Sequence, residues 1–139
     1  PPPSTVTPID GETVRQPSAP NGCLFGIDAP VLNQPGYSAL GQPVPGGQQS
    51  RNALLDFVGG GSLTLGPQEG TSYGRTVARV TCRGEDASAH QVRSGMAWVF
   101  ERYASDQSLF RLQDDAKAAG RGLVSERTPV PPWEWRKAR

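Results

Sequence analysis

The chain has 139 residues, which is enough for one hydrophobic core and too few for two ordinary domains. Its 14 Lys and Arg residues nearly balance 13 Asp and Glu residues, and a net charge of +1 does not by itself indicate a nucleic-acid-binding protein. All cations except Lys117 and Lys137 are Arg, which can bind phosphate in a bidentate manner. The sequence has no run of about 18 apolar residues and therefore predicts no membrane-spanning helix.

The N-terminal segment, residues 1–8, is rich in proline and is expected to be extended or disordered. The chain starts with Pro1, and Met96 is its only methionine, which indicates a processed or trimmed product. Such an opening suits the tether that follows an export signal or lipid anchor, and a boundary cut within a longer chain explains it equally well. We therefore expect a secreted, periplasmic or otherwise exported protein under the first of these interpretations.

An apolar run that begins at Leu24 ends at Asp28 and is followed by Pro30, which has no N–H for a strand ladder. This pattern predicts a buried strand with Asp28 at its rim. Upstream, residues 10–13 read Asp-Gly-Glu-Thr, a turn that leads into a strand over residues 13–16, with residues 23–27 as the second arm. If these strands form a hairpin, Glu12 and Asp28 approach the same rim, and two carboxylates with a backbone carbonyl suit Ca²⁺.

The middle of the chain alternates between strand and helix signals. Residues 31–47 have little periodicity and predict a long loop or a flap, and residues 48–58 predict a helix that ends at Gly59. Residues 62–65 predict a strand, residues 66–72 a polar loop, and residues 76–83 a half-buried strand.

The last third of the sequence predicts helices. A capping box at Ser88 opens a short helix that ends near Gly95, and Ser105 or Asp106 caps a third helix that ends at Gly120. The apolar stripe of this third helix consists of Leu109, Leu112, Ala116 and Ala119. The proline-rich tail is expected to be extended and to act as a structural strap that carries Trp133 and Trp135. Strands early and helices late predict an α+β fold.

The cysteines and the aromatic residues have mainly structural interpretations. Cys23 and Cys82 leave a disulfide open, although the strand pattern favours Cys82 as a small buried hydrophobe. His90 is the only histidine and is expected to be a surface or structural residue. Trp98 and Phe100 are expected to pack in the core, whereas Tyr103 is expected to be exposed. These three could also stack on bases.

Five short motifs occur in an order that resembles the staphylococcal nuclease family. They are Asp-Gly-Glu-Thr, Gly-Ile-Asp-Ala-Pro, Tyr-Gly-Arg, Ser-Gly-Met-Ala-Trp-Val and Pro-Pro-Trp-Glu-Trp-Arg. The resemblance runs from about Ile9 to Arg136 and implies a single domain over residues 9–139. It implies a five-stranded OB-type β-barrel with three helices. It also implies Ca²⁺-dependent hydrolysis of phosphodiester bonds in DNA or RNA.

The resemblance also assigns roles within the site. Glu12 and Asp28 match the family's metal-binding acids, although the family usually has Asp at the first of these positions. Ala29 would add its backbone carbonyl, and Asp10 matches an acid near the metal. Arg75 matches a phosphate-binding Arg, with Tyr73 at a phosphate-contacting position.

Two positions depart from the family pattern. Val31 stands where the family has the Glu that activates water, and Cys23 stands where it has its other phosphate-binding Arg. Neither side chain can do the expected task, because an alkyl group accepts no proton and a thiol carries no fixed positive charge.

We therefore expect a degenerate site in a nuclease homologue that is impaired or inactive. Such a protein would bind nucleic acid or dock on a protein assembly, with weak Ca²⁺ binding or none. The alternative is an active Ca²⁺-dependent endonuclease with a non-standard base. In that case, Arg15 or Arg51 could reach the phosphate, and Glu69 could replace the missing Glu.

Overall fold

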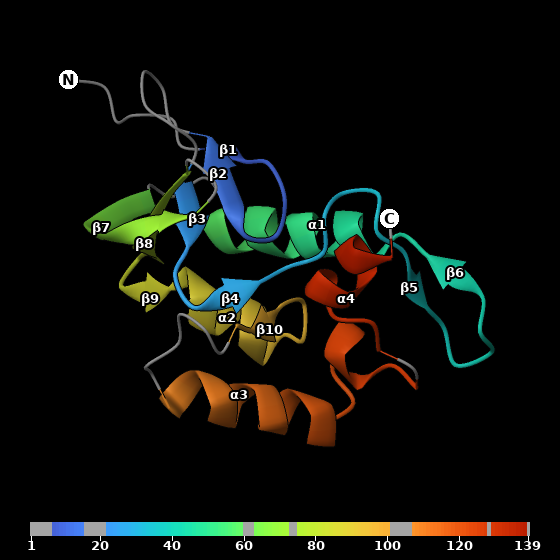
Figure 1. Cartoon of the computed structure of the whole chain (residues 1–139). Coiled ribbons are helices and arrows are strands. Elements are labelled where there is room, and N and C mark those ends of the chain that lie inside the picture. The colour runs from blue at the N-terminus through green and yellow to red at the C-terminus, as the bar shows by residue number, and fades with distance from the viewer. Residues whose placement is uncertain are drawn as a thin grey trace.

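The computed structural model describes residues 7–15, 22–59, 63–72, 75–100, 107–127 and 129–138 (Figure 1). Strands predominate in the first part of the chain and helices in the second, which confirms the α+β prediction. In chain order, the elements are β1 (Thr7–Pro8), β2 (Thr13–Arg15), β3 (Gly22–Leu24), β4 (Ile27–Asp28), β5 (Gly36–Tyr37), β6 (Pro43–Val44), α1 (Gly46–Val58), β7 (Leu63–Ser72), β8 (Arg75–Cys82), β9 (Glu85–Asp86), α2 (Ala87–Arg93), β10 (Trp98–Val99), α3 (Gln107–Ala118), the 3₁₀ helix η1 (Leu123–Ser125) and α4 (Pro132–Lys137).

The main sheet has the strand order β1-β2-β3-β8-β7, with β9 paired to β8. The β2–β3 pair is antiparallel, as the hairpin hypothesis requires, and β3 runs parallel to β8. Two further pairs, β4 with β10 and β5 with β6, form separate antiparallel ladders. This mixed sheet is consistent with the expected OB-type fold, and the ladders among the described strands leave the sheet open.

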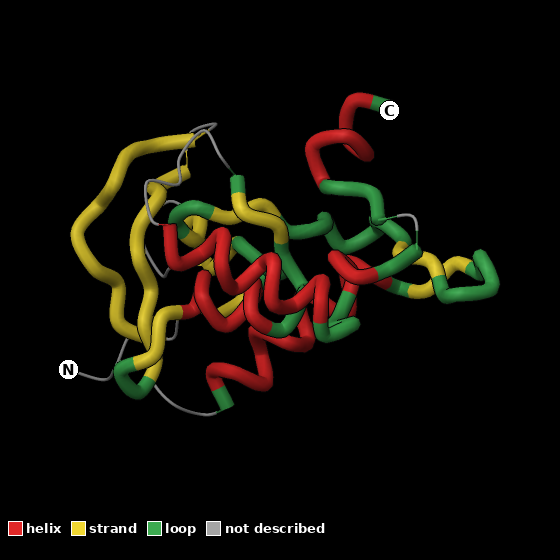
Figure 2. Tube along the Cα trace, turned by 90° about the horizontal axis from the view of Figure 1, so that it is seen from below, coloured by secondary structure: helices red, strands yellow, loops and turns green. Residues whose placement is uncertain are grey.

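The core lies between the main sheet and the helices, which gather on one side of the strands (Figure 2). Helix α1 ends at Gly59, which takes the left-handed conformation with φ 51°. A second, smaller apolar cluster joins β10, α3 and η1. The buried members of the main core are Val14, Leu24, Ile27, Ala29, Leu54, Phe57, Val80, Cys82, Ala87, Val92, Ala97, Val99 and Leu109.

Two segments that were expected to be loops contain strands. Residues 66–72 belong to β7, which stays paired with β8 through register shifts between Leu65 and Gln68 and between Gln68 and Gly70. Such bulges let a strand that contains Gly and Pro continue along its partner. Within residues 31–47, β5 and β6 form a short hairpin that projects from the body of the molecule (Figure 1).

The apolar run before Asp28 is two strands and not one. Gly26 has φ 80°, a left-handed conformation that favours glycine, and it makes the turn between β3 and β4. The start of α2 also differs from the prediction, because Asp86 is the N-cap and accepts a hydrogen bond from the backbone N–H of Ala89. Ser88 instead donates to the backbone carbonyl of Phe25 at 2.7 Å.

The tail is helical in part, which corrects the prediction of an extended strap. Pro132 is the first residue of α4, a position where its fixed φ suits a helix and its missing N–H is not needed. Trp133 on α4 stacks on Phe100, with ring centroids 5.8 Å apart. The strap therefore does pack on the protein, as a short helix.

The remaining structural expectations have mixed outcomes. Cys23 and Cys82 are both buried thiols and not a disulfide pair. His90 stacks on Phe57, with ring centroids 4.6 Å apart, and burial lowers its pKa below the usual value. In the stripe of α3, Leu109 and Ala116 are buried, whereas Ala119 just beyond the helix is exposed. The proposed caps of α3 and residue 103 lie outside the described residues.

We predict that Leu54→Ala lowers the free energy of unfolding by about 3 kcal/mol, because the side chain is 0% exposed and its removal leaves a cavity in the core. Leu40→Ala is the matched control, since Leu40 is 89% exposed and its loss should cost less than about 0.5 kcal/mol. Urea denaturation of both variants measures the difference. Equal losses would contradict this account of the core.

Candidate active site

The turn before β2 fixes the first acidic residue of the site. The Oδ1 atom of Asp10 accepts hydrogen bonds from the backbone N–H groups of Glu12 at 2.9 Å and Thr13 at 2.8 Å. Asp side chains favour such turns because they satisfy backbone donors locally. Asp10 therefore shapes the loop that presents Glu12.

Residues of helices α1 and α2 contact this turn and fix its position. A side chain at Gly11 would place its Cβ only 1.8 Å from the hydroxyl of Ser50, so this close approach requires glycine. The buried amide of Gln91 donates to the backbone carbonyls of Gly11 at 2.9 Å and Ser50 at 3.0 Å. The loop that carries Glu12 is thus tied to two helices.

Strand β4 brings the second acidic residue to the same place. Asp28 pairs with Trp98 of β10, and the backbone N–H of Leu24 donates to the carbonyl of Glu12 at 2.8 Å. The side chain of Asp28 is 5% exposed. The structure therefore brings Glu12 and Asp28 together, as the hairpin hypothesis requires.

The two carboxyl groups share a hydrogen bond, and the pKa of Glu12 is raised well above 4.5. Burial is the main cause, followed by the negative charge of Asp28 and the hydrogen bond to it, and Asp10 adds a smaller repulsion. A backbone hydrogen bond from Ala29 acts in the opposite direction. Glu12 therefore keeps its proton to a higher pH than an ordinary glutamate.

Arg136 of α4 forms an ion pair with Asp28. Its Nη1 donates to Oδ1 of Asp28 at 3.2 Å, and its Nη2 donates to Oδ2 at 2.5 Å. This two-point contact is the strong geometry for a guanidinium and a carboxylate. Sequence reasoning missed Arg136 because the tail was expected to be extended. A helix starting at Pro132 would have placed Trp133 and Arg136, three residues apart, on one face.

Cys23 and Val31, the two residues that differ from the family pattern, cannot replace the phosphate-binding Arg and the water-activating Glu. Cys23 is 5% exposed and pairs with Thr13 of β2 and Val77 of β8 in the main sheet. Val31 follows the site strand closely, and its carbonyl accepts the backbone N–H of Gln34 at 2.9 Å. Neither offers a fixed positive charge or a proton acceptor on its side chain.

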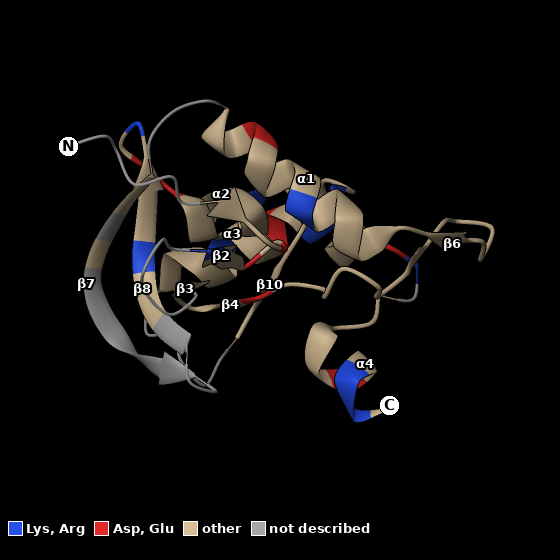
Figure 3. Cartoon of the chain, turned by 90° about the horizontal axis from the view of Figure 1, so that it is seen from above, with Lys and Arg blue, Asp and Glu red and all other residues tan. Residues whose placement is uncertain are grey.

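The other expected residues are only partly placed. Arg75 begins β8 opposite Ser72, but its side chain lies outside the described part, as does all of Tyr73. The side chain of Glu69 is likewise outside it. Arg15 is an exposed residue of β2, and Arg51 is a partly buried residue of α1. Figure 3 shows that cationic segments are spread over β8, α1 and α4 and do not form one patch.

The donor set fits a weakly held divalent cation. Within the described ranges, no three His, Cys, Asp or Glu side chains are grouped to hold a metal. However, Glu12 and Asp28 offer adjoining carboxylate oxygens, which are hard donors of the kind that Ca²⁺ prefers. Because the pKa of Glu12 is raised, mainly by burial, a cation must displace its proton before both carboxylates can bind. A bound Ca²⁺ would supply electrostatic stabilisation of the charge that develops on a phosphate.

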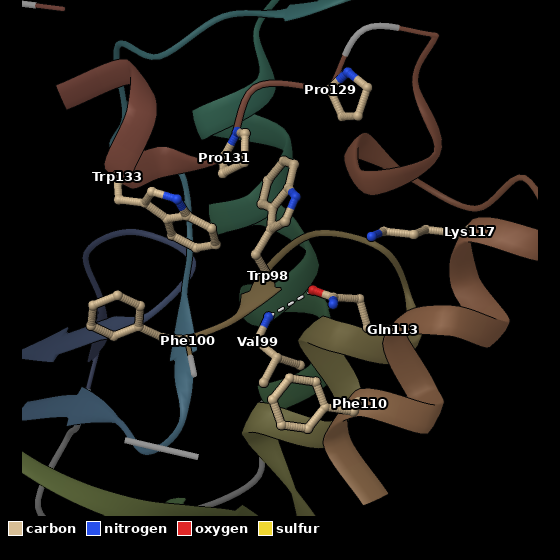
Figure 4. Close-up of a pocket in the computed structure, with 9 residues that line it drawn as sticks. All are labelled: Trp98, Val99, Phe100, Phe110, Gln113, Lys117, Pro129, Pro131 and Trp133. Carbon is tan, nitrogen blue, oxygen red and sulfur yellow. Dashed lines mark hydrogen bonds between the residues drawn. The ribbon is translucent and has the colours of Figure 1, made fainter. Parts of the chain in front are cut away.

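An aromatic groove of about 480 Å³ lies between β10, α3 and the tail (Figure 4). Trp98, whose backbone pairs with Asp28, lines the groove and is only 6% exposed, as its predicted core role requires. Gln113 of α3 accepts the backbone N–H of Val99 at 2.8 Å and thereby holds β10 against α3. The remaining lining residues are Phe100, Phe110, Lys117, Pro129, Pro131 and Trp133.

Comparisons with known proteins agree with the motifs. Residues 23–126 match the family described as "Staphylococcal nuclease homologue". The chain is 33% identical over 135 residues to an "Uncharacterized endonuclease" of Escherichia coli O157:H7, covering 94% of this chain and 82% of that protein. It is 30% identical over 145 residues to "Protein ParB" of Escherichia coli, covering 93% and 75% of the two chains.

A plant relative is similar over a shorter part of its length. The "Probable staphylococcal-like nuclease CAN3" of Oryza sativa subsp. japonica is 34% identical over 114 residues. The match covers 82% of this chain and 28% of the plant protein, so the chain spans less than a third of that relative.

We predict that Glu12→Gln removes a pH dependence of stability in calcium-free solution. Above pH 4.5, the unfolded state releases the Glu12 proton while the folded state keeps it. The contribution of Glu12 to stability is therefore greatest below pH 4.5 and falls by up to about 1.4 kcal/mol per pH unit until the pH passes the pKa of folded Glu12. Gln stays neutral and should abolish this slope.

The measurement is the free energy of unfolding in EDTA from about pH 4.5 to 8, for the unmodified protein, for Glu12→Gln and for Glu85→Gln. Glu85 is an exposed residue of β9, so its substitution should leave the slope in place. Parallel curves for the unmodified protein and Glu12→Gln would show that Glu12 does not hold the proton.

Proposed function

The chain belongs to the staphylococcal nuclease family, whose members are generally Ca²⁺-dependent, and from this premise we propose that it is a catalytically weakened member that binds nucleic acid. In this proposal, Glu12, Asp28 and the backbone of Ala29 hold Ca²⁺ weakly, with Asp10 shaping the loop beside them. Arg75 contacts the phosphate, and Tyr73, two residues before it, makes a further contact with the phosphate. The acids are retained, whereas the proton acceptor and one phosphate-binding cation are not.

The observation that carries the proposal is the burial of Cys23 in the main sheet together with an alkyl side chain at position 31. Loss of one preorganised donor to a transition state costs about 3 to 4 kcal/mol, and loss of a general base costs about 10² to 10⁴ in rate. Both losses together leave little hydrolysis even where the metal and the substrate bind.

Nucleic acid as the partner is supported by the surroundings of the acidic pair. The groove lined by Trp98, whose backbone pairs with Asp28, combines aromatic side chains with Lys117, and single-stranded sites use this combination to stack bases and attract phosphates. Because the net charge is only +1, we expect few phosphate contacts and a shallow dependence of affinity on salt. No helix in the described residues is long and apolar enough to cross a membrane.

One observation favours a second candidate, an active endonuclease with a non-standard base. The pKa of Glu12 is raised, and in this candidate Asp28 and Ala29 hold the metal while Glu12 exchanges protons, as carboxyl groups do in acid–base catalysis. An Escherichia coli relative over most of this chain carries the name "Uncharacterized endonuclease". In this candidate, Glu12 takes the role that Val31 cannot perform.

We predict that Val31→Glu increases Ca²⁺-dependent cleavage of fluorescent single-stranded DNA and RNA at least about 100-fold, because it restores a carboxylate that can accept a proton from water. Val31→Gln is the matched control, since it has the same size and no basic oxygen of that strength. Cleavage is measured with Ca²⁺ and with EDTA.

Cleavage and binding assays on the unmodified protein distinguish the weakened enzyme from the active endonuclease. Slow or undetectable cleavage, a gain in Val31→Glu only, and binding of the labelled strands by fluorescence anisotropy support the weakened enzyme. Rapid Ca²⁺-dependent cleavage that Arg75→Ala and Glu12→Gln both abolish supports the endonuclease. Absence of both cleavage and nucleic-acid binding refutes both and favours docking on a protein assembly.

A further inference from the structure

Helix α4 places a positive charge on the proposed metal ligand. Both oxygens of Asp28 accept hydrogen bonds from Arg136, which lies 108 positions later in the sequence. Asp28 is buried, whereas the side chain of Arg136 is 43% exposed. The contact therefore joins an internal carboxylate to the exposed end of the tail helix.

Helix α4 is short and is held in place by identifiable contacts. The helix has six residues, and helices shorter than about 12 residues are marginal on their own in water. Its position depends on Pro132, which is buried, on the stacking of Trp133 on Phe100, and on the pair between Arg136 and Asp28. Just before the helix, the amide of Gln34 donates to the carbonyl of Val130 at 3.0 Å. Loss of the ion pair would therefore remove one of the contacts that position α4.

We propose that Arg136 and Ca²⁺ compete for Asp28, so that α4 regulates the metal site that it covers. This inference rests on the metal site of the proposed function. Ca²⁺ binds carboxylate oxygens at about 2.3 to 2.6 Å. The two guanidinium nitrogens lie 2.5 and 3.2 Å from the same oxygens, so the metal enters only when at least one of these hydrogen bonds opens.

Competition acts in both directions. If Arg136 weakens Ca²⁺ binding by some factor, Ca²⁺ weakens the docking of α4 by the same factor, because the two binding free energies are linked. Coupling between sites of this kind is typically about 5- to 150-fold. In the absence of metal, α4 is closed over the acidic pair, and metal binding releases it.

The test compares Arg136→Gln with Lys137→Gln, an equal charge change at the next residue of the same helix. Isothermal titration calorimetry of the full chain with CaCl₂ should give a dissociation constant about tenfold lower for Arg136→Gln than for the unmodified protein and for Lys137→Gln. Arg136→Lys keeps the charge without the two-point contact and should fall between them. Circular dichroism shows whether each variant is folded.

A second measurement needs no variant. Hydrogen exchange of the backbone amides in residues 130–138 of the unmodified protein should become faster when Ca²⁺ is added. Equal or weaker Ca²⁺ binding by Arg136→Gln, or slower exchange in these residues, would overturn the inference. If no form binds Ca²⁺, the inference and the metal part of the proposed function both fail. If the affinity difference holds but no nucleic acid is bound or cut, only the proposed function fails.

Discussion

The buried negative charge of Asp28 is the constraint on which the rest of the site depends. A carboxylate that is 5% exposed is costly unless opposite charge and hydrogen bonds surround it. Three distant segments meet this need. The turn at Asp10 presents Glu12, whose pKa is raised; β10 holds β4 through the pairing of Trp98; and α4 brings Arg136. The fixed turn, the small ladder and the tail helix are therefore parts of one electrostatic arrangement, and disturbing any one of them exposes or unbalances the same carboxylate.

Features that depend on local patterns could be predicted from the sequence. Helix α1 was expected to end at Gly59 because a glycine with positive φ is the usual way to stop a helix, and β8 was expected because Ala78, Val80 and Cys82 alternate. The proximity of Glu12 and Asp28 could also be predicted from the sequence, because a hairpin brings the two ends of its arms together. Each of these inferences needs only neighbouring residues and the geometry of one strand pair.

Features that depend on contacts between residues far apart in the sequence could not be predicted from it. The polar, Gly-containing segment 66–72 is a strand because β8 offers a ladder for it, and its own residues favour a loop. The helix in the tail could not be predicted for a different reason. Proline disfavours a helix interior but suits a first helical turn, so Pro132 alone does not distinguish a helix from an extended segment. The contact of Arg136 with Asp28 could not be found from spacing, because 108 positions separate the residues and only the docking of Trp133 brings them together.

Charge counting explains why the fold tolerates the two departures from the family pattern. The carboxyl groups of Glu12 and Asp28 could together carry two negative charges; the raised pKa of Glu12 lowers the first of these, and the guanidinium of Arg136 balances the second. The departures also cancel, because Cys23 removes the positive charge of the family's Arg and Val31 removes the negative charge of its Glu. The site thus keeps its overall charge balance while losing two groups that act on substrate. Catalysis can therefore be lost while stability is kept, because the electrostatic part of stability depends on the total charge of the site, whereas catalysis depends on the position of each charged group.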